Sequence, residues 1–281
     1  MKVVLFMSVT VLAVLILLFL ARWRGKAKDE SYRLVVSDPQ GRELGPSDVA
    51  RLTGTGTLNW AVVGSEHVSR RAEELHELGR QAGEAGDHDR ALHLFAQAHE
   101  EAPEWPYPVY DAAYTYLLKG DLGQAQGEYE VVERLAPRGF FTYKSELDCI
   151  RRERAGEFLA GTCRFYVSIA DMPASAEKRA LLEKLLQGSP SFAPAWEKLA
   201  GLLEDNDARL AAIEKGLSCK PDAQTRGTLL MNKALTIRSQ GKHDEAISIL
   251  RQLASDPEST LDTELKAKFA LANLLGKRNG Q

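Results

Sequence analysis

The sequence predicts an all-α protein, a solenoid of helical hairpins preceded by a single N-terminal transmembrane helix and a short mixed linker. Three observations carry this prediction. Residues 3–21 form an almost uninterrupted apolar run. From Ala72 onward, apolar residues recur at the three- and four-residue steps of an amphipathic helix. The pattern then returns after 34 residues, and such a period is typical of solenoids because one hairpin cannot bury its own apolar face.

The apolar run predicts a membrane anchor. Residues 3–21 read VVLFMSVTVLAVLILLFLA, in which only Ser8 and Thr10 are polar. As a helix the run would span roughly 28 Å, close to the ~30 Å thickness of the hydrocarbon core. A cleaved signal peptide is the alternative, but its apolar core is usually shorter, and the bulky ARWRGK follows here in place of small residues. We therefore expect residues 1–22 to form an uncleaved anchor in a lipid bilayer.

Charges beside this run predict its orientation. Lys2 precedes it, whereas Arg22, Arg24, Lys26 and Lys28 follow it. The positive-inside rule then places the rest of the chain in the cytoplasm. We expect the membrane to be a bacterial inner membrane. The three cysteines form no CxxC pair, and so sparse a count suits a reducing compartment. The opposite topology, with the repeats in the periplasm, is the alternative.

Residues 23–68 read as a juxtamembrane linker of mixed character. YRLVV at 32–36 predicts a short strand, and DPQG at 38–41 predicts a turn. GTGTLNW at 54–60 reads as a loop. Neither GxGxxG nor GxxxxGK[ST] occurs there, so this segment predicts no phosphate-binding site, and we expect no cofactor and no small-molecule substrate.

The repeat is clearest in two stretches, GDHDRALHLF at 86–95 and GDLGQAQGEY at 120–129. In each, we expect the glycine to turn the chain in a left-handed conformation. A small residue then lets two helices cross, and an aromatic residue fills the gap between successive hairpins. These two residues are Ala91 and Phe95 in the first stretch, and Ala125 and Tyr129 in the second. Gly79 and Ala113 are the small residues on the preceding helices.

This spacing of small, aromatic and proline residues resembles the tetratricopeptide repeat (TPR) family, most strongly over 72–139. The resemblance extends over roughly 72–275 and implies a TPR superhelix in residues 69–281. The repeats it implies lie at about 72–105, 106–139, an irregular 140–190, 191–222 and 226–258, with a capping helix at 261–275. Within 140–190 we expect helices near 142–153, 156–171 and 175–187. Because the matching residues are structural, the resemblance is specific for fold and says little about function.

The resemblance also implies a concave groove, lined mainly by the first helix of each hairpin, that binds a protein or peptide partner. The groove positions of the family fall on Tyr107, Tyr110, Asp111, Tyr114 and Leu117 in the second repeat, and on His76 and Arg80 in the first. Tyrosines suit an interface because they are large and stiff, with a polar tip. Their alternative role is packing inside the protein. The Lys/Asn clamp of chaperone-binding members is absent, so we expect no binding of a terminal carboxylate.

Other chemistry finds little support. The net charge of −3 and the lack of a basic excess argue against a nucleic-acid partner. Four of the six histidines lie in the first repeat, but the spacings of His88, His93 and His99 do not suit metal binding along one helix. Cys163 and Cys219 lie in apolar helical contexts, where we expect buried, unreactive thiols. No catalytic pair stands out, so we expect no enzyme.

These observations together predict a membrane-anchored scaffold or adaptor that binds protein partners through its concave groove. The alternative is an envelope-assembly or secretion-accessory protein whose repeats face the periplasm.

Overall fold

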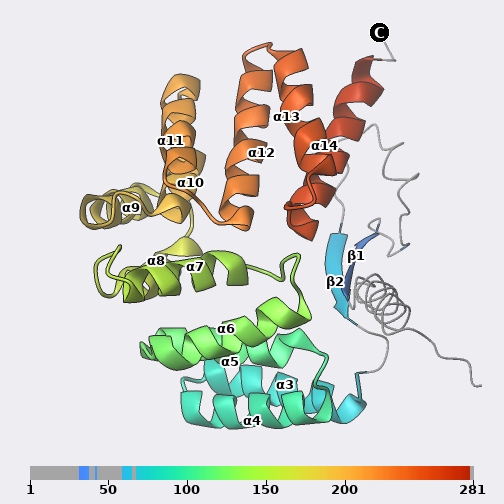
Figure 1. Ribbon diagram of the computed structural model, residues 1–281, viewed down its shortest axis with the longest axis vertical. Helices are drawn as coiled ribbons and strands as arrows, with labels where there is room; N and C mark the ends of the chain where they lie inside the picture. The colour runs from blue at the N-terminus through green and yellow to red at the C-terminus, as the bar shows by residue number, and fades with distance from the viewer. Residues whose placement is uncertain (1–31, 38–41, 43–58, 65–67, 279–281) are drawn as a thin grey trace, which may run out of the picture.

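The structure is a computed structural model that describes residues 32–37, 42, 59–64 and 68–278 (Figure 1). Most of the described chain is a curved stack of helices. Four pairs form hairpins of the predicted kind. They are α3 (Arg70–Glu84) with α4 (His88–Glu101), α5 (Pro106–Lys119) with α6 (Leu122–Leu135), α10 (Ala193–Leu202) with α11 (Asn206–Ser218), and α12 (Ala223–Ser239) with α13 (His243–Ser255). The predicted α-solenoid of hairpins is confirmed for this part of the chain.

The two glycine turns have the same geometry. Gly86 and Gly120 both have φ of +82°, the left-handed conformation that a glycine adopts without steric cost. The aspartate after each glycine caps the next helix: Asp87 accepts from the backbone amide of Arg90 at 3.2 Å, and Asp121 accepts from that of Gln124 at 3.1 Å. The repeated Gly-Asp therefore marks one structural joint that occurs twice.

The predicted crossing points are also confirmed. A Cβ atom added to Gly79 would lie 2.5 Å from Cε1 of Phe95, so only glycine lets α3 approach the ring of α4 this closely. Ala91 and Ala125 are fully buried, and Tyr129 is buried as completely. Burying a side chain the size of phenylalanine contributes about 1.5–3 kcal/mol, so these positions are a main source of stability in the first two hairpins.

The irregular middle of the chain holds α7 (Tyr143–Arg154), α8 (Thr162–Ala170) and α9 (Ala176–Gly188). The first and third match the predicted helices. The second begins six residues later than predicted, because Gly156 and Gly161 have φ of +77° and +88° and enclose a turn. Across this region the stack changes direction: α11, α12 and α13 run crosswise to α3–α6 in Figure 1.

The last helix, α14 (Leu261–Arg278), packs against α13 and α12 and runs slightly beyond the predicted capping helix at 261–275. Its start meets the loop that follows α6. The amide of Leu261 donates to the carbonyl of Arg138 at 3.0 Å, and the Arg138 guanidinium contacts the Glu264 carboxylate. We call these contacts, with the close approach of Gly139 to Thr260, the clasp. It joins residues more than 120 positions apart.

A small sheet lies beside α14. Strand β1 (Tyr32–Ser37) pairs antiparallel with β2 (Asn59–Gly64), in a register that sets Tyr32 opposite Gly64. The strand predicted at 32–36 is confirmed. The loop predicted at 54–60 is wrong for its last two residues, which begin β2, because NWAVVG gains a partner strand that the sequence does not place beside it.

The predicted anchor at 1–22 lies outside the described residues. Within the residues that the structure does describe, no helix has both the length and the apolar character needed to cross a bilayer.

Candidate functional site

A cavity of about 610 Å³ opens between the first half of the stack, which includes α5, α7 and α8, and the second half, which includes α10, α12 and α14. Side chains of α5, α7, α8, α10, α12 and α14 line it, together with the loop after α6 that forms part of the clasp. This volume lies in the range of ordinary ligand sites. The clasp brings α14 to one side of the cavity, so the site depends on helices that are distant in the sequence.

The structure brings three of the seven predicted binding residues to this cavity. Tyr110, Asp111 and Tyr114, all on α5, line it. The Tyr110 hydroxyl lies 2.7 Å from Oγ1 of Thr142 and bonds to it. Burial raises the pKa of Tyr110 and of Tyr114 above the usual tyrosine value, so both rings stay uncharged at neutral pH. Their role in binding a partner remains a prediction.

Tyr107 lies in an aromatic cluster instead. Its ring meets Phe140 edge-on with centroids 4.7 Å apart, and Phe141 at 5.4 Å. This is the internal packing that the sequence left open as an alternative for the tyrosines. Phe141 is about half exposed and lines the cavity, so the cluster extends from the core to the rim of the site.

His76 is buried and contacts Asp111 on the side away from the cavity. Its Nε2 lies 2.7 Å from Oδ2 of Asp111, and its ring meets Trp105 edge-on at 4.9 Å. The histidine therefore holds the Asp111 carboxylate at the cavity without lining the cavity itself. The sequence placed both residues at groove positions, but only the structure shows this pairing.

Two other predicted residues lie away from the cavity. Arg80 sits 3.9 Å from Glu84 of its own helix, and both side chains are largely exposed. Leu117 has no exposed surface and belongs to the core cluster around α5 and α6. In this arrangement neither can touch a ligand in the cavity.

Glu146 on α7 is the site residue that the sequence reasoning missed. Only 7% of its surface is exposed, and it lines the cavity. Its Oε1 accepts from the Thr142 hydroxyl at 2.7 Å, whereas Oε2 is buried among protein atoms. The Tyr129 hydroxyl lies beside this carboxyl group, and a side-chain hydrogen bond between the two lowers the pKa of Glu146 and raises that of Tyr129.

Burial raises the pKa of Glu146 to about 7, and the carboxylates of Asp171 and Asp222 push the pKa in the same direction. A signal for this residue was present in the sequence. The apolar stripe of α7 consists of Tyr143, Leu147 and Ile150. Glu146 lies on the same stripe, because it follows Tyr143 by three residues and precedes Ile150 by four. An acidic residue on a buried stripe is the pattern that would have identified it.

The cavity wall is predominantly acidic. Its carboxylates belong to Asp111, Glu146, Asp171, Glu197 and Asp262, against the ammonium groups of Lys198 and Lys266. Each lysine lies against a carboxylate of its own helix, with Lys198 3.3 Å from Glu197 and Lys266 2.7 Å from Asp262. The side chains therefore create a negative potential inside the cavity.

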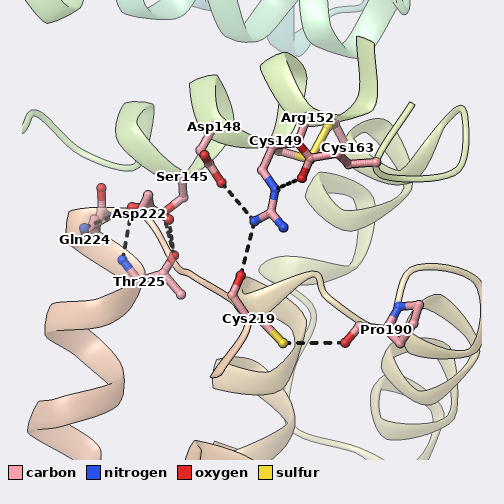
Figure 2. Close-up of polar contacts among 11 residues, drawn as sticks. Ser145, Asp148, Cys149, Arg152, Cys163, Pro190, Cys219, Asp222, Gln224 and Thr225 are labelled. Atoms are coloured by element: carbon pink, nitrogen blue, oxygen red, sulfur yellow. Dashed lines mark hydrogen bonds and ion pairs between the residues drawn. A yellow bond between two sulfur atoms is a disulfide. The ribbon is translucent and has the colours of Figure 1, made fainter. Parts of the chain in front are cut away.

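A disulfide joins α7 to the start of α8, close to this site. The Sγ atoms of Cys149 and Cys163 are 2.09 Å apart and their Cα atoms 5.8 Å apart, while Cys219 is free and buried (Figure 2). The expectation of an unpaired thiol is wrong for Cys163. The glycine turn between the helices brings the two residues together, and linear spacing gave no sign of this.

Arg152 links the same part of α7 to the second half of the stack. Its guanidinium lies 3.5 Å from the Asp148 carboxylate, 2.9 Å from that of Glu157 and 3.4 Å from the Cys219 carbonyl oxygen, as Figure 2 shows for Asp148 and Cys219. The side chain is mostly buried, so it fixes α7 against the segment that precedes α12.

Cys149, Glu153 and Cys163 are close enough together to suggest a metal site within the described part of the chain. The residues do not fit that role. The two sulfur atoms are bonded to each other, and the Glu153 carboxylate accepts from the backbone amides of Gly161 at 2.6 Å and Cys163 at 2.8 Å. The group therefore holds the turn between α7 and α8.

No family model matches the chain, and no curated protein matches it. Among solved structures, the chain is similar to TTC0263, a thermophilic TPR protein in Thermus thermophilus, with a TM-score of 0.31 and 20% identity over 72% of this chain and 98% of that one. It is also similar to a MamA RS-1 ArsTM double mutant, with a TM-score of 0.32 and 14% identity over 66% of this chain and 94% of that one. For MamA protein the TM-score is 0.27 and the identity 17%, over 70% of this chain and 93% of that one. These values carry no argument about function.

Proposed function

We propose that this protein is a scaffold or adaptor that binds a segment of a partner protein in the cavity between the two halves of its helical stack. One observation carries the proposal: Tyr110, Asp111 and Tyr114 line a cavity of about 610 Å³ that five further helices complete. The half-buried tyrosine rings offer contact area at little cost in side-chain entropy, and the carboxylate fixes orientation.

Site-specific crosslinking tests this proposal. A photoreactive phenylalanine analogue placed at Tyr114 should crosslink to the partner in intact membranes, whereas the same group at Tyr116 should not. Tyr116 is the matched control because it lies on the same helix, is similarly half-buried and does not line the cavity. Identical crosslinked products from both positions would contradict binding in the cavity.

The apolar run at 3–21 supports a second part of the proposal, that the protein acts at a membrane. The charges that follow the run favour a cytoplasmic position for the helical stack. The scaffold would then recruit its partner to the inner face of the bilayer.

The disulfide favours the second candidate, an envelope-assembly or secretion-accessory protein whose repeats lie in the periplasm. Disulfides persist in oxidising compartments and are rare in the cytosol. The Cys149–Cys163 bond is thus evidence against the topology that the flanking charges favour.

A reporter fused after Gln281 separates these two topologies. Active alkaline phosphatase together with a dark fluorescent protein would place the stack in the periplasm. Inactive phosphatase together with a bright fluorescent protein would place it in the cytoplasm, and Cys149 and Cys163 should then react with a thiol reagent in protein unfolded directly from cells.

A further inference from the structure

A chain of hydrogen bonds links the core to the cavity wall through the carboxyl group of Glu146. On its buried side, this carboxyl group shares a side-chain hydrogen bond with the hydroxyl of Tyr129, which has no exposed surface. On its other side, Oε1 accepts from the Thr142 hydroxyl at 2.7 Å, and Oγ1 of Thr142 lies 2.7 Å from the hydroxyl of Tyr110. The chain therefore joins α5, α6 and the start of α7 at one carboxyl group.

The tyrosines near Glu146 offer hydroxyl groups but no positive charge. Burial raises the pKa of each of them above the usual tyrosine value, so all are neutral near pH 7. They are Tyr110 and Tyr114 on α5, Tyr129 on α6 and Tyr166 on α8. A negative charge on Glu146 is therefore not compensated from these three helices.

The charged groups on the other sides of Glu146 are mainly carboxylates. Burial raises the pKa of Glu146 to about 7, and the carboxylates of Asp171 after α8 and Asp222 before α12 add to this effect. The wall also holds Asp111 on α5, Glu197 and Lys198 on α10, and Asp262 and Lys266 on α14. Both lysines lie beside a carboxylate of their own helix. A small change of pH near neutrality therefore changes the charge of this buried group.

The short segment before α7 is held in an uncommon conformation beside the same group. Phe141 has a backbone φ of +48°, which is unusual for an aromatic residue. Its side chain is about half exposed, and its ring centroid lies 5.2 Å from that of Tyr110. Such a conformation persists where neighbouring contacts hold it in place. The hydrogen bonds of Thr142 to Tyr110 and Glu146 are contacts of this kind.

We propose that Glu146 is a proton switch for the cavity, which binds its partner while this carboxyl group is protonated and releases it when the group ionises. Protonated Glu146 keeps Thr142 and Phe141 in place at the wall. Ionisation puts a charge among other carboxylates in a buried site, which is costly without water, and the wall at Thr142 opens to hydrate it. This inference rests on the function proposed above and adds the regulation of the same site.

The first test follows the wall in the full chain in detergent micelles. Phe141 is replaced by 4-trifluoromethylphenylalanine, and its fluorine NMR signal is recorded as the pH is raised through neutrality. We expect one transition with a midpoint close to the pKa of Glu146, about 7. Glu146→Gln keeps the shape of the side chain but cannot ionise, so the transition should disappear in this variant. Titration of His76, which contacts Asp111, would persist there and is distinguished in this way.

Glu101→Gln is the matched control because Glu101 is exposed on α4 and does not line the cavity. The transition at Phe141 should be unchanged in this variant. A cooperative thermal transition in both variants, on each side of neutral pH, establishes that the fold is retained.

The second test measures the effect on the partner by the crosslinking at Tyr114 described above, in membranes held at pH 6 and at pH 8. Between these values the protonated fraction of a group with a pKa of about 7 falls from about nine-tenths to about one-tenth. We therefore expect the crosslinked yield to fall by about fivefold, since binding follows the population of the competent state. In Glu146→Gln the yield should be the same at both values.

Two outcomes would overturn the switch whether or not a partner binds: a fluorine signal at Phe141 that does not change with pH, and a transition that survives in Glu146→Gln. Equal crosslinking at pH 6 and pH 8 would overturn the coupling to the partner while leaving the proposed function intact. Identical products from Tyr114 and Tyr116 would remove the proposed function, and the release of a partner with it, even if the wall titrates.

Discussion

The first two hairpins follow the sequence repeat, whereas the three helices after them do not. In α3–α6 the sequence period assigns nearly every structural role: a glycine in the turn, a small residue at the crossing, an aromatic ring in the gap. In α7–α9 the period is lost, and there the chain places a disulfide, a buried carboxylate and a change in stacking direction. Departures from a local rule often mark functional or strained sites, and Glu146 fits that expectation.

Removing the disulfide should have the largest effect on stability, and this effect should be confined to the irregular region, α7–α9. Replacing Cys149 and Cys163 together by alanine should lower the free energy of unfolding by about 3 kcal/mol, because the bond closes a loop of 14 residues in the unfolded chain. Chemical denaturation of the oxidised protein and the variant measures this difference.

Hydrogen exchange then shows where the loss occurs. Amides of α7 and α8 should lose protection, whereas those of α3 and α4 should keep it. Equal loss across the stack would break the proposed distinction between the two regions.

Glu146 should make stability depend on pH. Its pKa is raised from 4.5 to about 7 in the folded protein, so the folded state holds the proton more tightly than the unfolded chain. The stabilising contribution is present in full below about pH 4.5 and is lost as pH rises through 7, at a total cost of up to about 3 kcal/mol.

The Glu146→Gln variant cannot ionise, so its advantage over the unmodified protein should grow between pH 5 and 8. Unfolding curves at several pH values measure this trend, with Glu101→Gln as the comparison variant. A constant difference across this range would show that Glu146 is not the group responsible.

The smallest predicted effect distinguishes two glycines of α3. Gly79→Ala should destabilise the protein by about 1–2 kcal/mol, because the added Cβ atom would meet the Phe95 ring at 2.5 Å. Gly83→Ala should be neutral or slightly stabilising, since its Cβ atom would lie 3.8 Å from that of Ala91 and alanine favours the helix. Thermal denaturation compares the two. Equal effects would mean that the repeat period does not dictate the crossing point.

Much of the regular region was predictable because its determinants are local. The 34-residue repeat of the sequence predicts the turn at Gly86-Asp87, the buried Ala91 and the packing of Phe95 on Gly79. The candidate site was predictable only in part. Tyr110, Asp111 and Tyr114 are predicted from the repeat register and line the cavity. Tyr107 and Leu117 share that register, but Tyr107 packs half-buried in an aromatic cluster and Leu117 is buried in the core.

Glu146 and the Cys149–Cys163 bond escaped prediction for a physical reason. Their surroundings depend on a turn of seven residues between α7 and α8 and on helices from both halves of the stack. Neither the turn nor the contacts between distant helices produce a periodic pattern in the sequence. The acidic interruption of an apolar stripe at Glu146 was the one local sign available.

The sequence by itself determined the hairpins, their joints and the apolar segment at 3–21, because helix periodicity, left-handed glycines and hydrophobic length act over a few residues. Tertiary structure alone decided that the loop at Arg138 meets Leu261, and that α5, α7, α8, α10, α12 and α14 enclose one cavity. Those contacts depend on the small rotations between successive helices, which accumulate along the stack. Their sum, rather than any single motif, sets which distant side chains meet.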